Sequence, residues 1–407
     1  MGRTIFYNVS GGGHVIATYG IVSELVARGE EVIYYEAPWF QQEIEALGAE
    51  FRPYPEIRPY TGPLARSSFH HEMDLPVVLT WSALEWIPQL LEPARAARPD
   101  YIVHDSMCVW GRVIAQLLDV PAYASVHIPA VSWPLVLRHG SYWRDLPMMV
   151  ARSFQSVRAF RRLERQLRTT YGIPPTTLID TITNRQPINI CHAPRELQPM
   201  DGLFDDTYHF VGSVHTRPPQ EHGFPLERLR DPLVYIGFGT ICDPGVEFFR
   251  NCVRAFADLE VQVVMVLSRS TTVADLGDIP RNMIVWSLTE DGMAPQMEIL
   301  SRATVFLMNG GNGGAREGGW FGVPLIAVPP TFETEMISKR IAQQGAGIHI
   351  PLARATPQRL RQAVETIVAN PTPFRENSAR IGDACRRSGG GVAAAEAILK
   401  DVDARRR

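Results

Sequence analysis

The sequence has no large excess of charge of either sign. Its 407 residues include 40 basic and 43 acidic side chains, which leaves a formal net charge of −3. A chain so close to neutrality creates no overall field that would attract nucleic acid, so we expect no nucleic-acid partner. Cysteine is also scarce: five residues are scattered along the chain without a C-x-x-C pair or a spacing typical of a metal site. These features predict a cytoplasmic protein without a metal centre.

Long apolar runs are missing as well. No uninterrupted apolar stretch of about 18 residues or more occurs, which argues against a membrane span. The amino terminus, MGRTIFYNVS, has no charged segment followed by an apolar core, and it predicts a strand instead of a secretion signal. The length of 407 residues exceeds what a single hydrophobic core usually organises, so we expect two domains of about 200 residues each.

Strand-like apolar runs alternate with helical periodicity along most of the chain. Residues 5–9 predict a strand, the apolar residues from 21 to 26 share one face of a helix, and EVIYYEA predicts the next strand. The alternation starts again at PLVYIGFGT, and Thr356 before Pro357 is typical of a helix cap and first helical position. This order indicates the α/β class, with two doubly wound parallel sheets covered by helices.

The two predicted sheets are separated by HTRPPQEHGFP, which carries three prolines and no periodicity. Such a stretch is typical of a linker. We therefore expect a first domain over residues 1–214, a linker over 215–230, a second domain over 231–387 and a terminal helix over 388–407.

Two glycine clusters each stand between a predicted strand and a predicted helix, where doubly wound sheets bind ligands. In NVSGGGHVIATYG, three consecutive glycines precede His14. The dinucleotide pattern G-x-G-x-x-G is absent there, which disfavours a nicotinamide dehydrogenase. In MNGGNGGAREGGW, glycines let backbone N–H groups approach a ligand, and a helix start attracts an anion. Asn309 and Asn312 add amide donors, and Glu317 could accept the hydroxyls of a ribose. This second cluster predicts a nucleotide site, although a tight turn with close helix packing gives the same pattern.

These segments, taken in order, resemble the family 1 glycosyltransferases, in particular the bacterial macrolide-type enzymes that glycosylate natural products. The resemblance rests on three stretches, which are HVIATYGIVSELVARGEEVIYY, LVYIGFGT with EFFRNCVRAFADL, and APQMEILSRATVFLMNGGNGGAREGGWFGVPLIAVPPTFETEMISKRIAQQGAG. It implies the GT-B architecture: two Rossmann-like domains face each other across a cleft, the first binds the acceptor, the second binds the donor, and the terminal helix crosses back to the first.

The resemblance also implies the chemistry. The expected enzyme is an inverting glycosyltransferase that moves a sugar from a UDP- or dTDP-linked donor to a hydroxyl of a small-molecule natural product. No cofactor is required beyond the nucleotide-sugar co-substrate, and no metal is required. The expected partners are these two small molecules, and a homodimer is compatible with the sequence.

The resemblance makes His14 the general base that takes the proton from the acceptor hydroxyl, and Asp105 its orienting carboxylate. An imidazole, with a pKa of about 6.5, can accept a proton at neutral pH, and a carboxylate on its other nitrogen fixes the tautomer. Both residues follow predicted strands of one sheet, so we expect them to be close; the alternative for His14 is a turn histidine bonded to backbone. The predicted acceptor-binding residues are Gly12, Gly13, His127 and Trp133, although the stretch VHIPAVSW around the last two could also be ordinary interdomain core.

Donor contacts are assigned to the second domain by the same resemblance. Thr240 matches a hydroxyl placed against the diphosphate, Glu317 a ribose carboxylate and Glu333 an acidic residue that takes sugar hydroxyls. The backbone at residues 293–294 matches the place where the base is held. The predicted donor-binding set is Gly239, Thr240, Ser268, Met293, Ala294, Asn309, Gly310, Gly311, Asn312, Gly313, Gly314, Glu317, Glu333 and Thr334.

Several positions depart from the family pattern. Asn309 stands where a histidine is usual, Gly314 where a small hydroxyl residue is usual, and Thr334 where a glutamine is usual. Two alternatives therefore stay open. One is a GT-B transferase with a lipid acceptor, in which the arginine-rich segment 151–172 would contact anionic lipid, although such a charged face is usually just solvated. The other is a non-catalytic GT-B protein that binds a nucleotide sugar or a partner enzyme.

Overall fold

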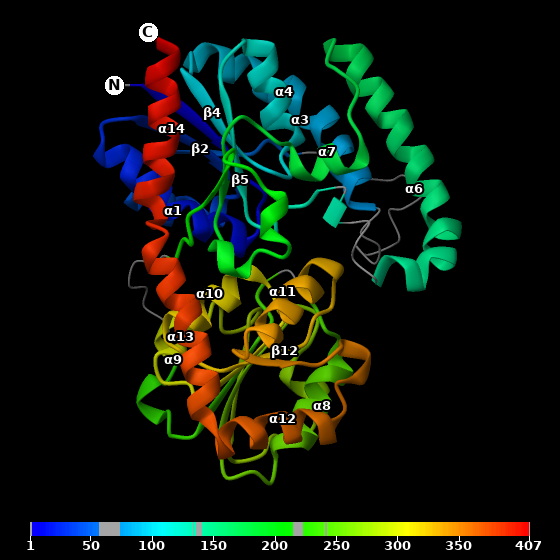
Figure 1. Cartoon of the computed structure of the whole chain (residues 1–407), viewed down its shortest axis with the longest axis vertical. Helices are drawn as coiled ribbons and strands as arrows, with labels where there is room; N and C mark the ends of the chain where they lie inside the picture. Colours follow the sequence, from blue (N-terminus) through cyan, green and yellow to red (C-terminus); the bar gives the residue numbers. More distant parts are fainter. Residues whose placement is uncertain are drawn as a thin grey trace.

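The computed structural model describes residues 2–56, 74–132, 134–135, 141–214, 223–240 and 242–406, without the side chains of residues 141–153. It has two halves stacked along the long axis, and each half is a parallel β-sheet flanked by helices (Figure 1). The predicted α/β class with two doubly wound parallel sheets is confirmed.

The amino-terminal half contains a seven-stranded sheet in the order β3-β2-β1-β4-β5-β6-β7, and every pairing in it is parallel. All five residues of the central strand β4 are buried, as expected for a strand with helices on both faces. The strands are β1 (Arg3–Tyr7), β2 (Glu31–Glu36), β3 (Glu50–Pro53), β4 (Tyr101–Asp105), β5 (Ala122–Val126), β6 (Asn189–Cys191) and β7 (Tyr208–Phe210). The helices are α1 (Gly12–Ala27), α2 (Gln41–Ala46), α3 (Leu75–Ala97), α4 (Val109–Leu118), α6 (Ser141–Tyr171) and α7 (Leu178–Thr183).

The carboxy-terminal half contains a six-stranded parallel sheet in the order β10-β9-β8-β11-β12-β13. Its strands are β8 (Leu233–Gly237), β9 (Gln262–Leu267), β10 (Met283–Ser287), β11 (Val305–Met308), β12 (Leu325–Ala327) and β13 (Gly347–His349). Its helices are α8 (Val246–Phe256), α9 (Gln296–Leu300), α10 (Asn312–Trp320), α11 (Phe332–Gln343), α12 (Pro357–Ala369) and α13 (Pro371–Arg387). The predicted cap before α12 is confirmed, since the Thr356 side chain accepts a hydrogen bond from the N–H of Arg359.

The last helix, α14 (Gly390–Arg406), lies against the amino-terminal half beside α1, so the two ends of the chain are close together (Figure 1). The two helices approach closely at Gly20 and Gly391, and a side-chain carbon added to Gly391 would clash with the backbone carbonyl of Gly20. Farther along α14, Asp401 accepts a 2.9 Å hydrogen bond from the hydroxyl of Tyr123, and the side chains of Arg406 and Asp100 form a 3.1 Å ion pair. The terminal helix therefore adds to the core of the first sheet, which is not its neighbour in sequence.

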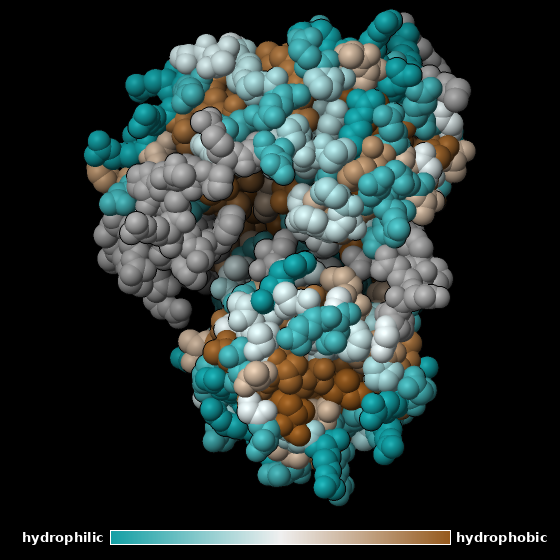
Figure 2. Space-filling view, turned by 180° about the vertical axis from the view of Figure 1, so that it is seen from behind, coloured by the Kyte–Doolittle hydropathy of each residue, from teal (hydrophilic) through white to brown (hydrophobic). Residues whose placement is uncertain are grey.

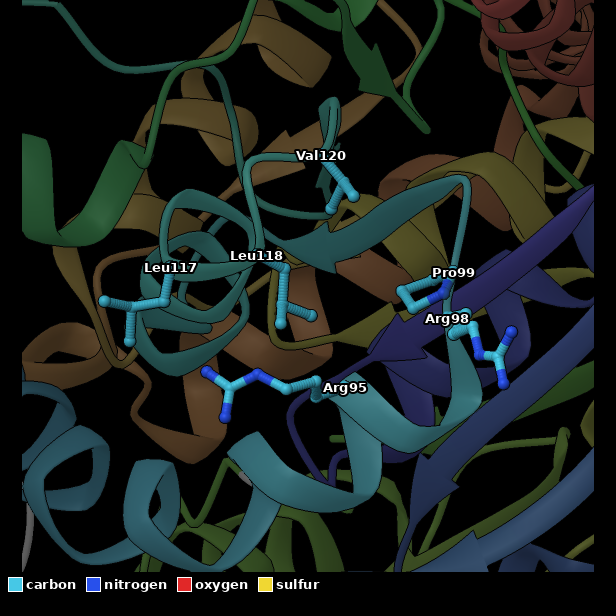
Figure 3. Close-up of a pocket in the computed structure, with 6 residues that line it drawn as sticks. All are labelled: Arg95, Arg98, Pro99, Leu117, Leu118 and Val120. Atoms are coloured by element: carbon cyan, nitrogen blue, oxygen red, sulfur yellow. The ribbon is translucent and has the colours of Figure 1, made fainter.

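Two surface features lie away from the carboxyl edge of the first sheet. A cavity of about 310 Å³ is lined by residues that precede β4 and β5 or end α3 and α4, namely Arg95, Arg98, Pro99, Leu117, Leu118 and Val120 (Figure 3). On α6, the arginines at 158, 161, 162 and 165 are exposed, as expected for a solvated face. Each helix in the described ranges is too short or too polar to cross a bilayer.

Candidate active site

His14 and Asp105 form a hydrogen-bonded pair at the carboxyl edge of the first sheet. His14 lies in the first turn of α1, which follows β1, and Asp105 is the last residue of the adjacent strand β4. The distance from Nδ1 of His14 to Oδ2 of Asp105 is 2.6 Å. The other carboxylate oxygen of Asp105 accepts a 2.7 Å bond from the N–H of Met107, which fixes the carboxylate plane. Parallel order thus brings together two residues that are 91 positions apart.

Burial and charge act in opposite directions on this pair. Burial of the His14 ring disfavours the charged form, but the Asp105 carboxylate outweighs it and the pKa of His14 is raised. Burial also acts to raise the pKa of Asp105, but the His14 and His127 rings and the hydrogen bonds lower it overall. Asp105 is therefore a carboxylate at neutral pH, and only 14% of the His14 side chain is exposed. The arrangement stabilises a proton on His14 once that proton has been accepted.

Three histidines stack side by side above the ends of β1, β5 and β6. The ring centroid of His14 lies 4.7 Å from that of His127, which lies 4.3 Å from that of His192. The hydroxyl of Ser125 lies 3.0 Å from Nε2 of His127 and 2.8 Å from Nε2 of His192. Burial lowers the pKa of both His127 and His192 well below the usual range. His14 is thus the one member of this stack whose pKa is raised.

A second buried carboxyl group, that of Glu36, borders the same loop. Glu36 ends β2, and its Oε1 accepts hydrogen bonds from the Ser10 hydroxyl and from the N–H of Ala37. Its Oε2 is buried without a hydrogen-bond partner. Burial raises the pKa of Glu36 to about 7, and Asp105 contributes to that rise. The glycine-rich loop is therefore anchored through Ser10 to a carboxyl group that titrates near neutrality.

The two halves meet at this edge. A side-chain carbon added to Gly12 would lie 3.3 Å from the hydroxyl oxygen of Thr240, which follows β8 in the other half. From the first residue of α10, the side chain of Asn312 donates a 3.1 Å hydrogen bond to the backbone carbonyl of His127. Figure 2 shows a hollow with hydrophobic residues inside it in the amino-terminal half, above the junction. Residues predicted for the acceptor and the donor are thus brought to one place.

The second glycine cluster forms the turn between β11 and the start of α10. Gly310 has φ +79°, and a side-chain carbon there would lie 2.8 Å from the carbonyl oxygen of Thr334. The Asn309 amide donates a 3.0 Å bond to the carbonyl of Phe238 and accepts a 2.9 Å bond from the N–H of Gly311. Asn309 therefore joins the loops after β8 and β11, and its polar atoms are used within the protein.

The other departures from the family pattern also have local structural reasons. At Gly314, a side-chain carbon would lie 3.1 Å from the terminal methyl of Met308, so the larger Met308 side chain occupies that space. Thr334 is only 3% exposed, and its hydroxyl pairs with Thr331 to cap α11. These contacts make α11 begin well before the SKRIAQQ segment.

The remaining donor-side predictions fall into two groups. On α10, Glu317 is bonded to the amide of Gln296, which in turn accepts a 2.9 Å bond from the Tyr235 hydroxyl. Met293 is 40% exposed just before this group, whereas Ala294 packs against the core. Ser268, which follows β9, is buried and donates a 2.9 Å bond to Asp243.

Three more residues lie around the pair of His14 and Asp105, and the sequence predicted a role for one of them, Glu333. The negative charge of Glu333, at the start of α11, contributes to the raised pKa of His14. His192 and Arg316 were not anticipated; His192 could have been found because it directly follows a strand of the same sheet, but Arg316 carried no such signal. Trp133 lies outside the described residues, so its assignment to the acceptor stays a prediction.

The site also has the spacing of a possible metal-ligand set. His14, Asp105 and His127 each bring one nitrogen or oxygen atom to within 4.8 Å of the others. The fit to a resident metal is poor, because the short bond between His14 and Asp105 already uses a ligand atom of each. The same donor set could still take up an added transition-metal ion in competition with the proton on His14.

Comparisons with known proteins show which family the chain is similar to. Residues 250–388 match the family described as erythromycin biosynthesis protein CIII-like, C-terminal domain. The chain is 30% identical to the oleandomycin glycosyltransferase of Streptomyces antibioticus over 98% of this chain and 90% of that protein. It is 25% identical to the uncharacterized UDP-glucosyltransferase YojK of Bacillus subtilis (strain 168), over 99% of this chain and 98% of that protein. The crystal structure of the calicheamicin glycosyltransferase CalG4 superposes with a TM-score of 0.75 at 27% identity, covering 98% of each chain.

The two parallel sheets and the similarity to CalG4 define a GT-B glycosyltransferase. The chain belongs to the family 1 glycosyltransferases, in the bacterial group of natural-product enzymes. This membership confirms the family resemblance and the prediction of a sugar-transferring enzyme.

Proposed function

We propose that the enzyme transfers a sugar from a UDP- or dTDP-linked donor to a hydroxyl of a small natural product, with inversion at the anomeric carbon. The observation that carries this proposal is the 2.6 Å bond between Nδ1 of His14 and Asp105 at the junction of the two halves. That bond occupies Nδ1 and leaves Nε2 of the same ring to take a proton. His14 is therefore the base and Asp105 its orienting carboxylate.

The proposed reaction is a direct displacement. Nε2 of His14 takes the proton from the acceptor hydroxyl while the oxygen attacks the anomeric carbon through an oxocarbenium-like state. The bond from the anomeric carbon to the diphosphate oxygen breaks, and the backbone N–H groups at the start of α10 receive the departing charge. Asp105 stabilises the imidazolium that forms. The chemistry in this proposal requires no metal.

We assign one of the two substrates to each half of the protein. We assign the acceptor to residues 1–214, with Gly12, Gly13 and His127 next to His14, and the donor to residues 231–387. The terminal helix α14 (Gly390–Arg406) packs on the half that we assign to the acceptor. The name of the oleandomycin enzyme supports a natural-product acceptor, and that of YojK supports a UDP-sugar donor.

Binding of nucleoside diphosphates tests the donor assignment without knowledge of the acceptor. The melting temperature of the purified protein is measured with UDP, dTDP, ADP and GDP, because a ligand that binds only the folded state raises it. We expect UDP or dTDP to give the largest rise. The donor assignment would be contradicted if all four nucleoside diphosphates raised the melting temperature equally, or if none of them raised it. Mass spectrometry of reactions with the matching nucleotide sugar and a panel of hydroxylated natural products then detects transfer.

A further inference from the structure

Arg316 is a buried cation at the junction between the two halves. It lies in the second turn of α10 and is only 5% exposed. Its Nε donates a 3.2 Å bond to the carbonyl of Asn312 at the start of the helix. One terminal nitrogen donates a 2.9 Å bond to the carbonyl of His192 and a second bond to the carbonyl of Ser213. The guanidinium thus ties the first turn of α10 to the loops after β6 and β7 of the other half.

No carboxylate lies within ion-pair distance of the Arg316 guanidinium in the described ranges, and the charge of the neighbouring Glu317 offsets its burial only in part. Within the part of the chain that the structure describes, the hydrogen bonds of the Arg316 guanidinium all end on backbone carbonyls. Burial of a cation is costly unless an anion accompanies it, and here burial lowers the pKa of the guanidinium. By contrast, surface arginines such as Arg28 and Arg254 form ion pairs with glutamates. The free protein therefore has a buried positive charge that its own carboxylates compensate only in part.

The first turn of α10 provides a place for that anion. Gly311 precedes the helix without a side-chain cap, and the first turn has no acidic residue. Its backbone N–H groups and the helix dipole already favour negative charge, and the Arg316 guanidinium adds a full charge beside the same turn. The Asn309 amide adds no charge, because it is neutral and bonded to Phe238 and Gly311.

We propose that Arg316 is a positioning residue for the leaving group, and that the donor diphosphate is the counter-anion that this buried guanidinium lacks. The inference rests on the proposed function. Arg316 acts through α10: it holds the first turn against the loop that carries His192, and its charge strengthens the attraction of that turn for the diphosphate. The same charge contributes to the lowered pKa of His127 and His192, so that these rings stay neutral behind His14.

The test compares a charged ligand with its uncharged nucleoside. Dissociation constants for UDP and uridine, and for dTDP and thymidine, are measured by calorimetry for the wild type, Arg316→Gln and Arg316→Lys. We expect Arg316→Gln to weaken binding of the diphosphate about tenfold and binding of the nucleoside less than about twofold. Arg316→Lys, which keeps the charge, should stay within about threefold of the wild type for both ligands. Arg359→Gln on α12, an exposed site, controls for the change in net charge and should leave every constant unchanged.

A purely structural role predicts a different pattern. Equal weakening of nucleoside and diphosphate in Arg316→Gln, or no weakening of either, would overturn the proposal. If Arg316→Gln does not fold, Arg316→Lys decides. The proposal is supported if this variant keeps the wild-type preference for the diphosphate over the nucleoside, and it is overturned if that preference is lost. A wild type that binds neither UDP nor dTDP would refute the proposed function itself, and with it this inference.

Discussion

The side-chain amide of Asn312 donates a 3.1 Å hydrogen bond to the backbone carbonyl of His127. Asn312 is the first residue of α10, and the ring of His127 lies 4.7 Å from that of His14. One residue therefore separates the helix that we assign to the diphosphate from the ring that we assign as the base. A shift of α10 would therefore move His127 and alter the surroundings of His14, the proposed site of proton transfer.

Replacement of Asp105 by Asn should both slow transfer and move its pH dependence. The Asp105 carboxylate raises the pKa of His14, so its removal lowers that pKa. A base must be deprotonated to act, so the acid limb of the kcat/KM profile should move to lower pH in Asp105→Asn. The rate on the plateau should fall by about a hundredfold or more, because the imidazolium loses its counter-charge.

The matched control for this experiment is Asp206→Asn, at an exposed aspartate. Its profile should coincide with that of the wild type. An acid limb that stays in place in Asp105→Asn would contradict the coupling of Asp105 to His14.

Glu36 should make the folded protein less stable as pH rises. Its pKa is about 7 when folded, against an ordinary value of 4.5, so the folded state binds the proton more tightly than the unfolded state. The stability it contributes is complete below about pH 4.5 and is lost as pH rises through about 7, a loss on the order of 3 kcal/mol. The Gln side chain in Glu36→Gln cannot ionise, so the stability of this variant lacks that dependence on pH. Urea unfolding at several pH values should therefore show the wild type losing stability relative to Glu36→Gln between about pH 5 and 8; parallel curves would refute the raised pKa.

Metal ions should not be needed for transfer, but an added transition metal should inhibit it. Incubation with EDTA is expected to leave the rate unchanged. Micromolar Zn²⁺ should inhibit, because His14, Asp105 and His127 have atoms within 4.8 Å of one another and Zn²⁺ competes with the proton. His127→Gln removes one ligand and should relieve the inhibition. Loss of activity in EDTA that Mg²⁺ or Mn²⁺ restores would show that the proposed metal-free reaction is wrong.

Gly310 should not tolerate a side chain. Its φ of +79° disfavours other residues, and an added carbon would press on the Thr334 carbonyl at 2.8 Å and on the Ser338 hydroxyl. We expect Gly310→Ala to lower the free energy of unfolding by about 2 kcal/mol or more. Gly313→Ala is the control, because no atom lies within 4 Å of a side-chain carbon there. That variant should be neutral or slightly stabilised; equal stability of the two variants in thermal unfolding would contradict the described turn.

Much of the fold could be predicted because it depends on local patterns. Buried strands such as YIVHD and alternating helices specify parallel sheets, and the carboxyl ends of parallel strands share one edge. This alone places Asp105 near the loop of His14. The start of α11 was harder to predict, because it depends on the pairing of the Thr331 and Thr334 side chains instead of on apolar periodicity.

Contacts between segments far apart in the sequence could not be predicted from such patterns. Arg316 looks like any helical arginine in the sequence, and its burial follows from two carbonyl groups that belong to the other sheet. His192 enters the site through a serine on β5. The use of Asn309 as a bridge to Phe238 depends on a loop 71 residues away. Tertiary packing, which no local window contains, decides each of these three roles.

The central claim is that His14 removes the acceptor proton. The most direct test is kcat/KM of His14→Ala against the wild type, with the nucleotide sugar whose diphosphate stabilises the protein and an acceptor that it glycosylates. Donor affinity is measured in parallel, and His209→Ala, a partly buried histidine on β7, serves as the matched control. We predict that His14→Ala loses about a hundredfold to ten-thousandfold in kcat/KM while donor affinity is retained. Unchanged turnover in His14→Ala would contradict the assignment of this base.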